Sequence, residues 1–303
     1  MTITVRAPAK VNLVLVVGRP GEDGYHPLNT VYQAISLYDD VRVSDAEEWH
    51  VSVAPLGEID VSVVPLDESN IALRAGRALV AHHGLDLAAG IEIHKGIPVA
   101  GGLAGGSADA AAALVALDRL WDLRTSDDDL LAIAAELGSD VPFALLGGSA
   151  HGLGHGELVE PLTDHGSYWW VVVPSDDGLS TPAVYREFDA LHPDLTRAAH
   201  EESPTDLVAA LERGDPDALA SSMRNDLEGA ALSLRPELAE RMAQVQDHCD
   251  RTVMLSGSGP TILGLTTSQQ EALESRAALL EAGFEVVHVA TGPVAGAHVV
   301  EYA

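Results

Sequence analysis

The stretch from Pro98 to Leu114 reads PVAGGLAGGSADAAAAL and places four glycines directly before an alanine-rich helix former. Glycine sacrifices conformational entropy, so such a loop indicates that something approaches the bare backbone closely. Successive backbone N–H groups can wrap an anion, and a helix N-terminus adds about half a positive charge. A tight turn packed against a neighbour is the alternative, but the stretch favours phosphate binding. We expect the helix to begin at Ser107 or Ala108.

Several known nucleotide and hydrolase sites are excluded by inspection. Neither lysine is followed by Ser or Thr, which excludes a P-loop, and no G-x-G-x-x-G follows a strand. The His-Arg-Asp and Asp-Phe-Gly motifs of protein kinases are absent, as are H-E-x-x-H and G-x-S-x-G. The remaining histidines show no metal-ligand spacing. The loop therefore predicts an anion site of another kind.

Lysine is rare in this chain: of the 17 Lys and Arg residues, only Lys10 and Lys95 are lysines. Each is a candidate for a role that needs a compact ammonium group. The alternative is that both lysines have no special role and simply remain in an Arg-rich composition. In KVNLVLVV, apolar residues alternate with period two, so Lys10 and Asn12 share one strand face about 7 Å apart. The alternative for Lys10 is a surface lysine with a half-buried stem.

Strands and helices are expected to be mixed in both halves of the chain. The sequence predicts helices over 71–83, 107–121, 126–137, 205–213, 215–226, 235–248 and 268–282. It predicts strands over 10–17, 30–37, 40–44, 49–54, 59–64, 88–98, 168–174, 252–265 and 284–290, and a glycine-rich hairpin over 145–162. No regular βαβ repetition appears. We therefore predict two α+β domains, 1–163 and 164–303.

Composition limits the classes of function. The chain has 303 residues, and its one cysteine, Cys249, excludes an internal disulfide and a Cys-cluster metal site and fits a reducing cytoplasm. No apolar run reaches the roughly 18 residues of a membrane helix. A net charge of −29 opposes a nucleic-acid partner. A small anionic substrate in a pocket is not excluded by that charge, and the sequence sets no oligomeric state.

Five segments form an ordered set: APAKVNLVL, DGYHPL, the glycine-rich stretch, LGSDVPFALLGG and SGSGPTILGL. The set resembles the GHMP kinases (galactose, homoserine, mevalonate and phosphomevalonate kinases), from about Thr4 to the C-terminus. DGYHPL and GSDVPF are most similar to the branch that acts on a cytidine diphosphate of methylerythritol. The resemblance implies a mixed α+β N-terminal domain, a ferredoxin-like α+β C-terminal domain and a cleft between them. It also implies phosphate transfer from ATP, accompanied by Mg²⁺, to the 2-hydroxyl of methylerythritol; no Mg²⁺ ligand is evident.

The resemblance places the ATP phosphates on the glycine-rich loop and the adenine near Asn70 and Lys95. For these two residues, a solvated surface position is the alternative. The loop residues implied are Pro98, Val99, Ala100, Gly101, Gly102, Leu103, Ala104, Gly105, Gly106, Ser107 and Ala108. Ala104 replaces a glycine that is common in the family, and Ala108-Asp109 stands where Ser-Asn is common. Ser107 is then the only loop side chain able to approach a phosphate or metal.

The resemblance also implies the catalytic pair. Asp140 matches the aspartate that takes the proton from the acceptor hydroxyl, and Lys10 matches the lysine that stabilises it and neutralises charge on the transferring group. An ordinary helix N-cap is the alternative for Asp140.

For the acceptor, the resemblance implies cytosine stacked between Tyr25 and Tyr185, with His26 at its edge. Asn12 and Thr181 are further contacts. SGSGPT, from Ser256 to Thr261, is implied to face the site from the second domain. Loop packing for Tyr25 and His26, a buried helix position for Tyr185 and a plain hairpin turn for SGSGPT are the alternatives. Another GHMP kinase, or a nucleotide-binding module without catalysis, also stays open.

Overall fold

A computed structural model describes residues 1–300 except 23, 100, 176–177 and 200–201. Its larger sheet is built around two long antiparallel strands, β1 (Thr2–Val17) and β2 (Leu28–Asp45), which pair from Thr2↔Ser44 to Val17↔Leu28. The register shifts between Pro8 and Ala9 and between Asn12 and Val14. Such irregularities re-aim side chains next to functional sites, and here they flank Lys10 and Asn12.

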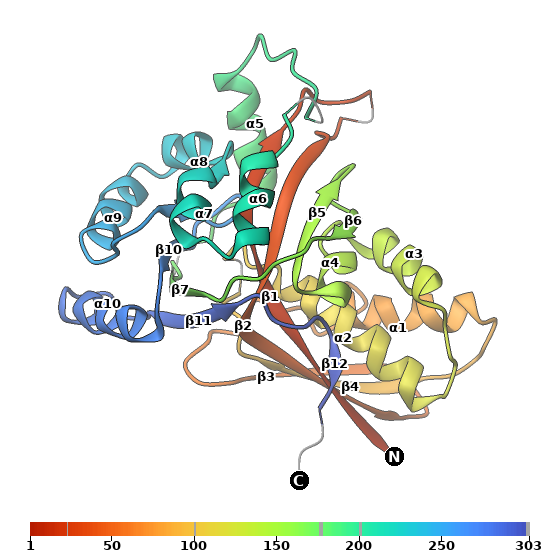
Figure 1. Ribbon diagram of the computed structural model, residues 1–303. Helices are drawn as coiled ribbons and strands as arrows, with labels where there is room; N and C mark the ends of the chain where they lie inside the picture. Colours follow the sequence, from red (N-terminus) through yellow and green to blue (C-terminus); the bar gives the residue numbers. More distant parts are fainter. Residues whose placement is uncertain (23, 100, 176–177, 200–201, 301–303) are drawn as a thin grey trace.

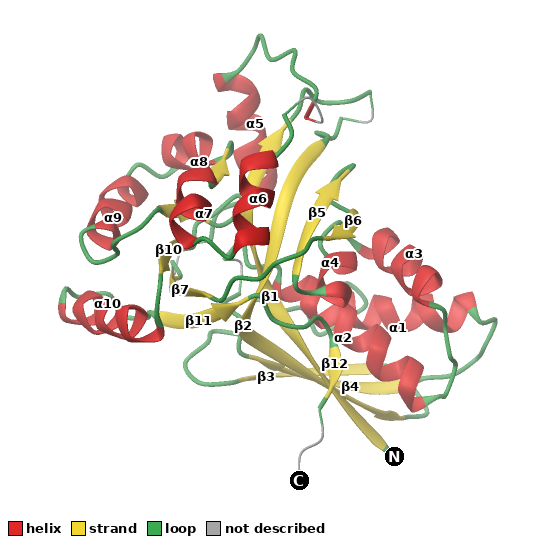
Figure 2. Ribbon diagram, in the orientation of Figure 1, coloured by secondary structure: helices red, strands yellow, loops and turns green. Residues whose placement is uncertain are grey.

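Six further strands of the described residues belong to the larger sheet. In the described residues it also contains β3 (His50–Pro55), β4 (Ala89–Lys95), β5 (Ser149–Leu153), β6 (Leu158–Pro161), β8 (Arg224–Asn225) and β12 (His298–Val299). Helices α1 (Ile71–His82), α2 (Gly105–Leu120), α3 (Asp127–Leu137) and α4 (Val141–Leu146) lie together on one side of it (Figure 2).

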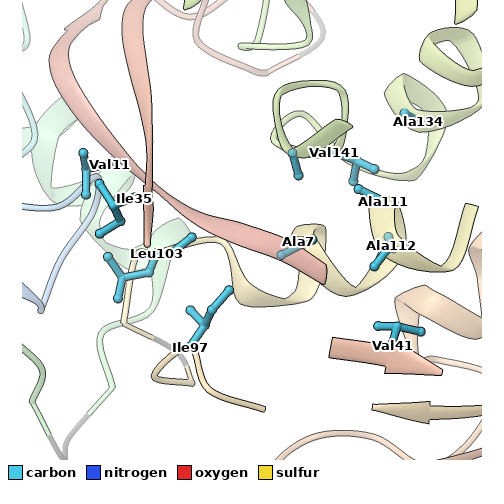
Figure 3. Packing of buried hydrophobic residues seen from close by; sticks show 14 of the residues in the cluster. Ala7, Val11, Ile35, Val41, Ile97, Leu103, Ala111, Ala112, Ala134 and Val141 are labelled. Carbon is cyan, nitrogen blue, oxygen red and sulfur yellow. The ribbon is translucent and has the colours of Figure 1, made fainter. Parts of the chain in front are cut away.

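Alanine lets α2 approach the sheet closely. Its buried residues include Ala108 and the run Ala110–Ala113, and small side chains allow helix and strand backbones to lie near each other. In Figure 3, Ala111 and Ala112 of α2 belong to the same cluster as Val11 of β1 and Ile35 of β2. The start of α2 is thereby fixed relative to β1.

The second half of the chain forms an antiparallel sheet in the order β11-β7-β10-β9, from β7 (Tyr168–Val173), β9 (Val253–Leu255), β10 (Ile262–Thr266) and β11 (His288–Gly292). Around it lie α5 (Thr181–Leu191), α6 (Thr205–Arg213), α7 (Pro216–Ser222), α8 (Glu228–Leu234), α9 (Glu237–Gln246) and α10 (Gln269–Glu281) (Figure 1). The predicted α+β class is confirmed. The boundary at 163 stays a prediction, and β8 and β12 from beyond it pair with β1.

Three sequence predictions of elements were wrong. Residues 59–64 form turns because Asp60 accepts a hydrogen bond from Ser62 N (2.8 Å), a local bond that competes with strand pairing. The helix predicted over 215–226 ends at Ser222, since Arg224 and Asn225 pair with β1 instead. Helix α8 was not predicted, whereas α4 and α5 were anticipated only as alternatives, through an N-cap at Asp140 and a helix position for Tyr185; each of these two helices carries proline in its first turn. Every helix of the described part of the chain is too short or too polar to cross a bilayer.

Candidate active site

A pocket of about 940 Å³ collects residues from both halves of the chain. Its walls are made by β1, the glycine-rich loop, the residues before α4, the first turns of α5 and the Gly257–Gly259 turn. Most of the predicted site residues line it: Lys10, Asn12, Tyr25, His26, Asn70, Lys95, Pro98, Val99, Gly101, Gly102, Ala104, Gly105, Gly106, Asp140, Thr181 and Tyr185.

Three residues of the predicted loop set do not line the pocket, and a fourth is not described. The side chains of Leu103 and Ala108 are buried in the hydrophobic core, because the loop must fold back onto the sheet before α2 begins. Ser107, in the first turn of α2, is half-buried and is not among the pocket residues. Ala100 lies outside the described residues. Any contact of Leu103 or Ala108 with a nucleotide would therefore use their backbone.

Lys10 and Asp140 meet across the pocket although they are far apart in the chain. Lys10 Nζ lies 3.6 Å from Asp140 Oδ2 and donates to Asn12 Oδ1 at 2.7 Å. Lys10 is only 8% exposed, so the surface alternative is wrong. Asp140 occupies the N-cap position of α4, but its side chain makes no capping hydrogen bond. Its carboxylate is thus paired with an ammonium and partly open to the pocket.

The amide of Asn12 has a fixed orientation. Asn12 Nδ2 donates to Thr30 Oγ1 (2.8 Å), and Thr30 in turn donates to the carbonyl oxygen of Val14 (2.7 Å). The predicted shared face of Lys10 and Asn12 is confirmed, because their side chains bond to each other. This chain of bonds holds the Lys10 ammonium in place beneath Asp140.

Tyr32 was missed by sequence reasoning. It stands opposite Asn12 in the β1–β2 register, stacks on Phe143 with ring centroids 4.9 Å apart, and has Lys10 Nζ 5.7 Å from its ring centroid. Burial, followed by the negative charge of Asp140, raises the pKa of its phenol well above the ordinary value. Tyr32 therefore stays protonated beside Lys10 and Asp140. Only the strand register could have indicated this position.

The glycine-rich loop is held between β1 and the second half of the chain. Lys10 N donates to Leu103 O (3.1 Å), and Ser256 Oγ donates to Gly102 O (3.1 Å). Gly102 has φ +77°, and a Cβ there would lie 2.4 Å from Ser256 O, so only glycine fits. Gly257 lies against Lys10 and Asn12. The expectation that SGSGPT faces this site is confirmed.

The helix after the loop begins at Gly105, two or three residues before the expected start at Ser107 or Ala108. Its N-cap, Ala104, adopts a left-handed conformation with φ 57° and ψ 35° and makes no side-chain capping bond. A left-handed alanine suffers a clash between Cβ and its own backbone of about 1–2 kcal/mol. The backbone at position 104 thus has a left-handed conformation that is typical of glycine, although the residue is alanine.

Ala104→Gly is expected to stabilise the protein. Relief of the left-handed strain exceeds the added entropy of an unfolded glycine, so the free energy of unfolding should rise by about 0.5–1 kcal/mol. Urea unfolding followed by circular dichroism measures this. Gly84→Ala, at φ +64° in an open turn, is the matched reverse change and should lower the free energy of unfolding. A decrease for Ala104→Gly would contradict the strain.

The other end of the pocket is aromatic. Tyr185 lies against His26 with ring centroids 5.1 Å apart, whereas Tyr25 is 66% exposed with its ring 5.4 Å from that of His155. His26 Nδ1 lies 2.8 Å from Gly18 O and therefore carries its proton there. Thr181 Oγ1 bonds to Ser258 Oγ at 2.8 Å, which links α5 to the turn after β9. Two hydroxyphenyl rings and two imidazoles thus form an aromatic part of the pocket lining.

The remaining predicted residues are buried. Asn70 caps α1: its Oδ1 accepts from Ala72 N (3.0 Å) and its Nδ2 donates to Pro65 O (2.7 Å). Lys95 donates to Asp39 and to Asp109 Oδ2 (2.7 Å). The surface alternative is therefore wrong for both Asn70 and Lys95. Sequence reasoning missed Asp39, and it gave Asp109 no role, because an acidic residue near a helix N-terminus is sufficiently explained by the helix dipole.

Family models and known proteins match this chain. Residues 70–148 match the family model GHMP kinases N terminal domain, and residues 207–285 match GHMP kinases C terminal. The 4-diphosphocytidyl-2-C-methyl-D-erythritol kinase of Nocardioides sp. is 57% identical over 99% of this chain and 100% of its own length. The enzyme of the same name from Streptomyces avermitilis is 46% identical, again over 99% and 100%.

Solved structures resemble the chain over almost its whole length. A crystal structure of 4-(cytidine 5'-diphospho)-2C-methyl-D-erythritol kinase has a TM-score of 0.75 and 33% identity, covering 96% of this chain and 98% of that one. A homoserine kinase from Cytophaga hutchinsonii has a TM-score of 0.71 at 21% identity, covering 99% and 97%. The second likeness concerns the fold alone.

Proposed function

Because the chain belongs to the 4-diphosphocytidyl-2-C-methyl-D-erythritol kinase family of the GHMP kinases, we propose that it phosphorylates the substrate for which that family is named. The reaction transfers the γ-phosphoryl group of ATP to the 2-hydroxyl of 4-diphosphocytidyl-2-C-methyl-D-erythritol and yields the 2-phosphate and ADP. It belongs to non-mevalonate isoprenoid precursor biosynthesis. The observation that carries the proposal is the Lys10–Asp140 pair beside the glycine-rich loop.

The Lys10–Asp140 pair can accept the proton of the 2-hydroxyl and stabilise the negative charge of the transferring phosphoryl group. Asp140 accepts the proton of the 2-hydroxyl while the hydroxyl oxygen forms a bond to the γ-phosphorus. The bond between that phosphorus and the leaving oxygen of ADP breaks. The Lys10 ammonium lies 3.6 Å from the Asp140 carboxylate, where it holds the carboxylate by charge attraction and can stabilise the negative charge of the transferring group. Partial burial strengthens both effects because the local dielectric is low.

The glycine-rich loop and the start of α2 supply the phosphate site. Gly101, Gly102, Gly105 and Gly106 line the pocket, and the helix N-terminus behind them favours negative charge. Mg²⁺ bound with ATP would neutralise part of the phosphate charge. Among the described residues, no group of three or more His, Cys, Asp or Glu is placed so that it could hold a metal ion.

The aromatic end supports recognition of the cytidine group, with Tyr25, His26 and Tyr185 as the proposed contacts and Asn12 and Thr181 nearer the reacting end. Cys249 is free and buried, which is consistent with a reducing cytoplasm as the place of action. The net charge of −29 supports a small-molecule partner over a nucleic acid.

Tyr185→Ala is expected to raise the KM for the cytidine substrate by about 10- to 100-fold, since stacking contributes about 1–3 kcal/mol per base. The KM for ATP should change less than twofold, because Tyr185 belongs to α5 and packs against His26, whereas the ATP phosphates are assigned to the glycine-rich loop. Initial-rate kinetics with each substrate varied in turn measure both constants. Tyr185→Phe keeps the ring and should stay within threefold of the parent. An equal rise in both KM values would contradict a cytidine role.

The proposed function is tested by coupled ADP release. The assay compares 4-diphosphocytidyl-2-C-methyl-D-erythritol with homoserine and mevalonate at matched concentrations. We expect turnover with the cytidine compound alone. Turnover with homoserine or mevalonate instead would indicate a different GHMP kinase, and ATP binding without turnover of any acceptor would indicate a binding module.

A further inference from the structure

Three charged side chains are buried together beneath the glycine-rich loop. Asp39 comes from β2, Lys95 from β4 and Asp109 from the second turn of α2, and none is more than 3% exposed. Lys95 Nζ donates to Asp39 Oδ2 and to Asp109 Oδ2. The reaction as proposed above uses none of these three groups. We call them the buried triad.

The buried triad connects the two ends of the loop. Asp39 Oδ1 accepts hydrogen bonds from Gly96 N (2.7 Å) and Ile97 N (2.9 Å), the two residues directly before Pro98. Its other oxygen binds Lys95, which reaches Asp109 beyond the loop. The chain therefore enters the loop and leaves it at points fixed by one carboxylate–ammonium–carboxylate bridge.

Gly105, the first residue of α2, lies directly over the buried triad. A Cβ at this position would lie 3.1 Å from Lys95 Nζ and 3.5 Å from Asp39 Oδ2. The glycine thus allows the loop backbone to rest on the ammonium group. This contact explains why the chain keeps glycine at a helical position where alanine has the higher helix propensity.

The triad also has more negative than positive groups. Burial raises the pKa of Asp39, and burial together with the charge of Asp39 raises the pKa of Asp109. Asp109 Oδ1 has no hydrogen-bond partner in the described part of the chain. Replacing Asp39 by Asn would leave one carboxylate for one ammonium, so the charge balance alone does not prevent this variant from folding.

We propose that Asp39 is a positioning residue for ATP, which sets the shape of the glycine-rich loop through Lys95 and through the amides of Gly96 and Ile97. The inference rests on the proposed function, because it assumes that the loop binds ATP phosphates. Asp39 is not among the residues that line the pocket, so it would act on ATP only through Lys95 and the loop backbone. In Asp39→Asn one amide group must serve both an ammonium and two backbone N–H donors, and its NH₂ end cannot accept from either.

The test measures nucleotide affinity apart from turnover. Calorimetric titration with the non-hydrolysable analogue adenylyl imidodiphosphate should give a Kd about tenfold higher for Asp39→Asn than for the parent. The KM for ATP should rise in parallel, whereas the KM for the cytidine acceptor should change less than twofold. A merely structural role would lower the active fraction without changing either constant.

Asp40→Asn is the matched control. Asp40 neighbours Asp39 on β2 and accepts from Arg6 Nε (2.8 Å) and Nη2 (2.9 Å), outside the pocket. Asp40→Asn should lower the free energy of unfolding but leave the Kd for the analogue within twofold of the parent value. Gly105→Ala is a second variant that keeps every charge and pushes a methyl group onto Lys95; it too should weaken analogue binding several-fold.

The outcomes distinguish a failure of the proposed kinase function from a failure of the positioning role of Asp39. If the parent protein does not bind the analogue, the proposed function fails. If the parent protein binds the analogue, and Asp39→Asn and Gly105→Ala each bind it as tightly as the parent does, the positioning role is overturned. Equal weakening by Asp39→Asn and Asp40→Asn would also overturn it, because the effect would then be a general one.

Discussion

Asp140→Asn is expected to lower kcat by about 10³-fold, within the range that a positioned general base contributes. The asparagine keeps the size of the side chain but cannot accept the hydroxyl proton. The Kd for ATP should change less than twofold, because the phosphates are assigned to the loop amides. Single-turnover ADP release and calorimetric ATP titration measure the two quantities.

The control for this experiment is Asp127→Asn, an exposed carboxylate in the first turn of α3. It should leave kcat within twofold of the parent. If Asp140→Asn retained more than a tenth of the parent kcat, proton transfer to Asp140 would not be part of the reaction. Loss of ATP binding would indicate instead that Asp140 holds the nucleotide or its metal ion.

Lys10→Met is expected to lower kcat by about 10²–10³-fold. Loss of one group that stabilises developing charge costs roughly 2.7–4 kcal/mol of transition-state stabilisation. Methionine fills much of the same volume, and thermal unfolding checks that the fold survives. Because Lys10 also supports Asp140, the double variant with Asp140→Asn should be far less impaired than the product of the single effects.

Lys10→Arg should not restore the rate. Lys10 Nζ donates to Asn12 Oδ1 (2.7 Å) and lies 3.6 Å from Asp140 Oδ2, and the longer side chain and planar guanidinium of arginine would not place a donor at the same point. Activity near that of the parent for the arginine variant would show that charge alone is sufficient. A fully multiplicative double variant would show that Lys10 and Asp140 act independently.

Local pattern was enough to predict some of the site. The period-two alternation of β1 placed Lys10 and Asn12 on one face, and the glycine-to-alanine transition placed a loop before α2. Both features follow from interactions between residues near in sequence. The order of the five motifs carried the family resemblance and, through it, the pairing of Lys10 with Asp140.

Long-range pairing was out of reach of the same reasoning. Tyr32 reaches Lys10 and Asp140 through the β1–β2 register, which includes two shifts that no sequence pattern indicates. The buried triad joins residues 56 and 14 positions apart, and Asp109 had a sufficient local explanation at the start of a helix. The left-handed conformation of Ala104 was hidden because alanine seldom adopts it.

The short strand β8 has a consequence for how ligands enter and leave. Asn225 pairs with Leu15 of β1, and its Nδ2 donates to Leu255 O (3.0 Å) and Gly257 O (2.7 Å). The strand that carries Lys10 is therefore tied by one residue to the turn on the opposite wall. Rigid-body opening of the two walls would have to break these bonds, so we expect the gap to keep its width through the catalytic cycle. Exchange of ADP for ATP would then depend on small movements of surface loops and rings rather than on wide hinge motion.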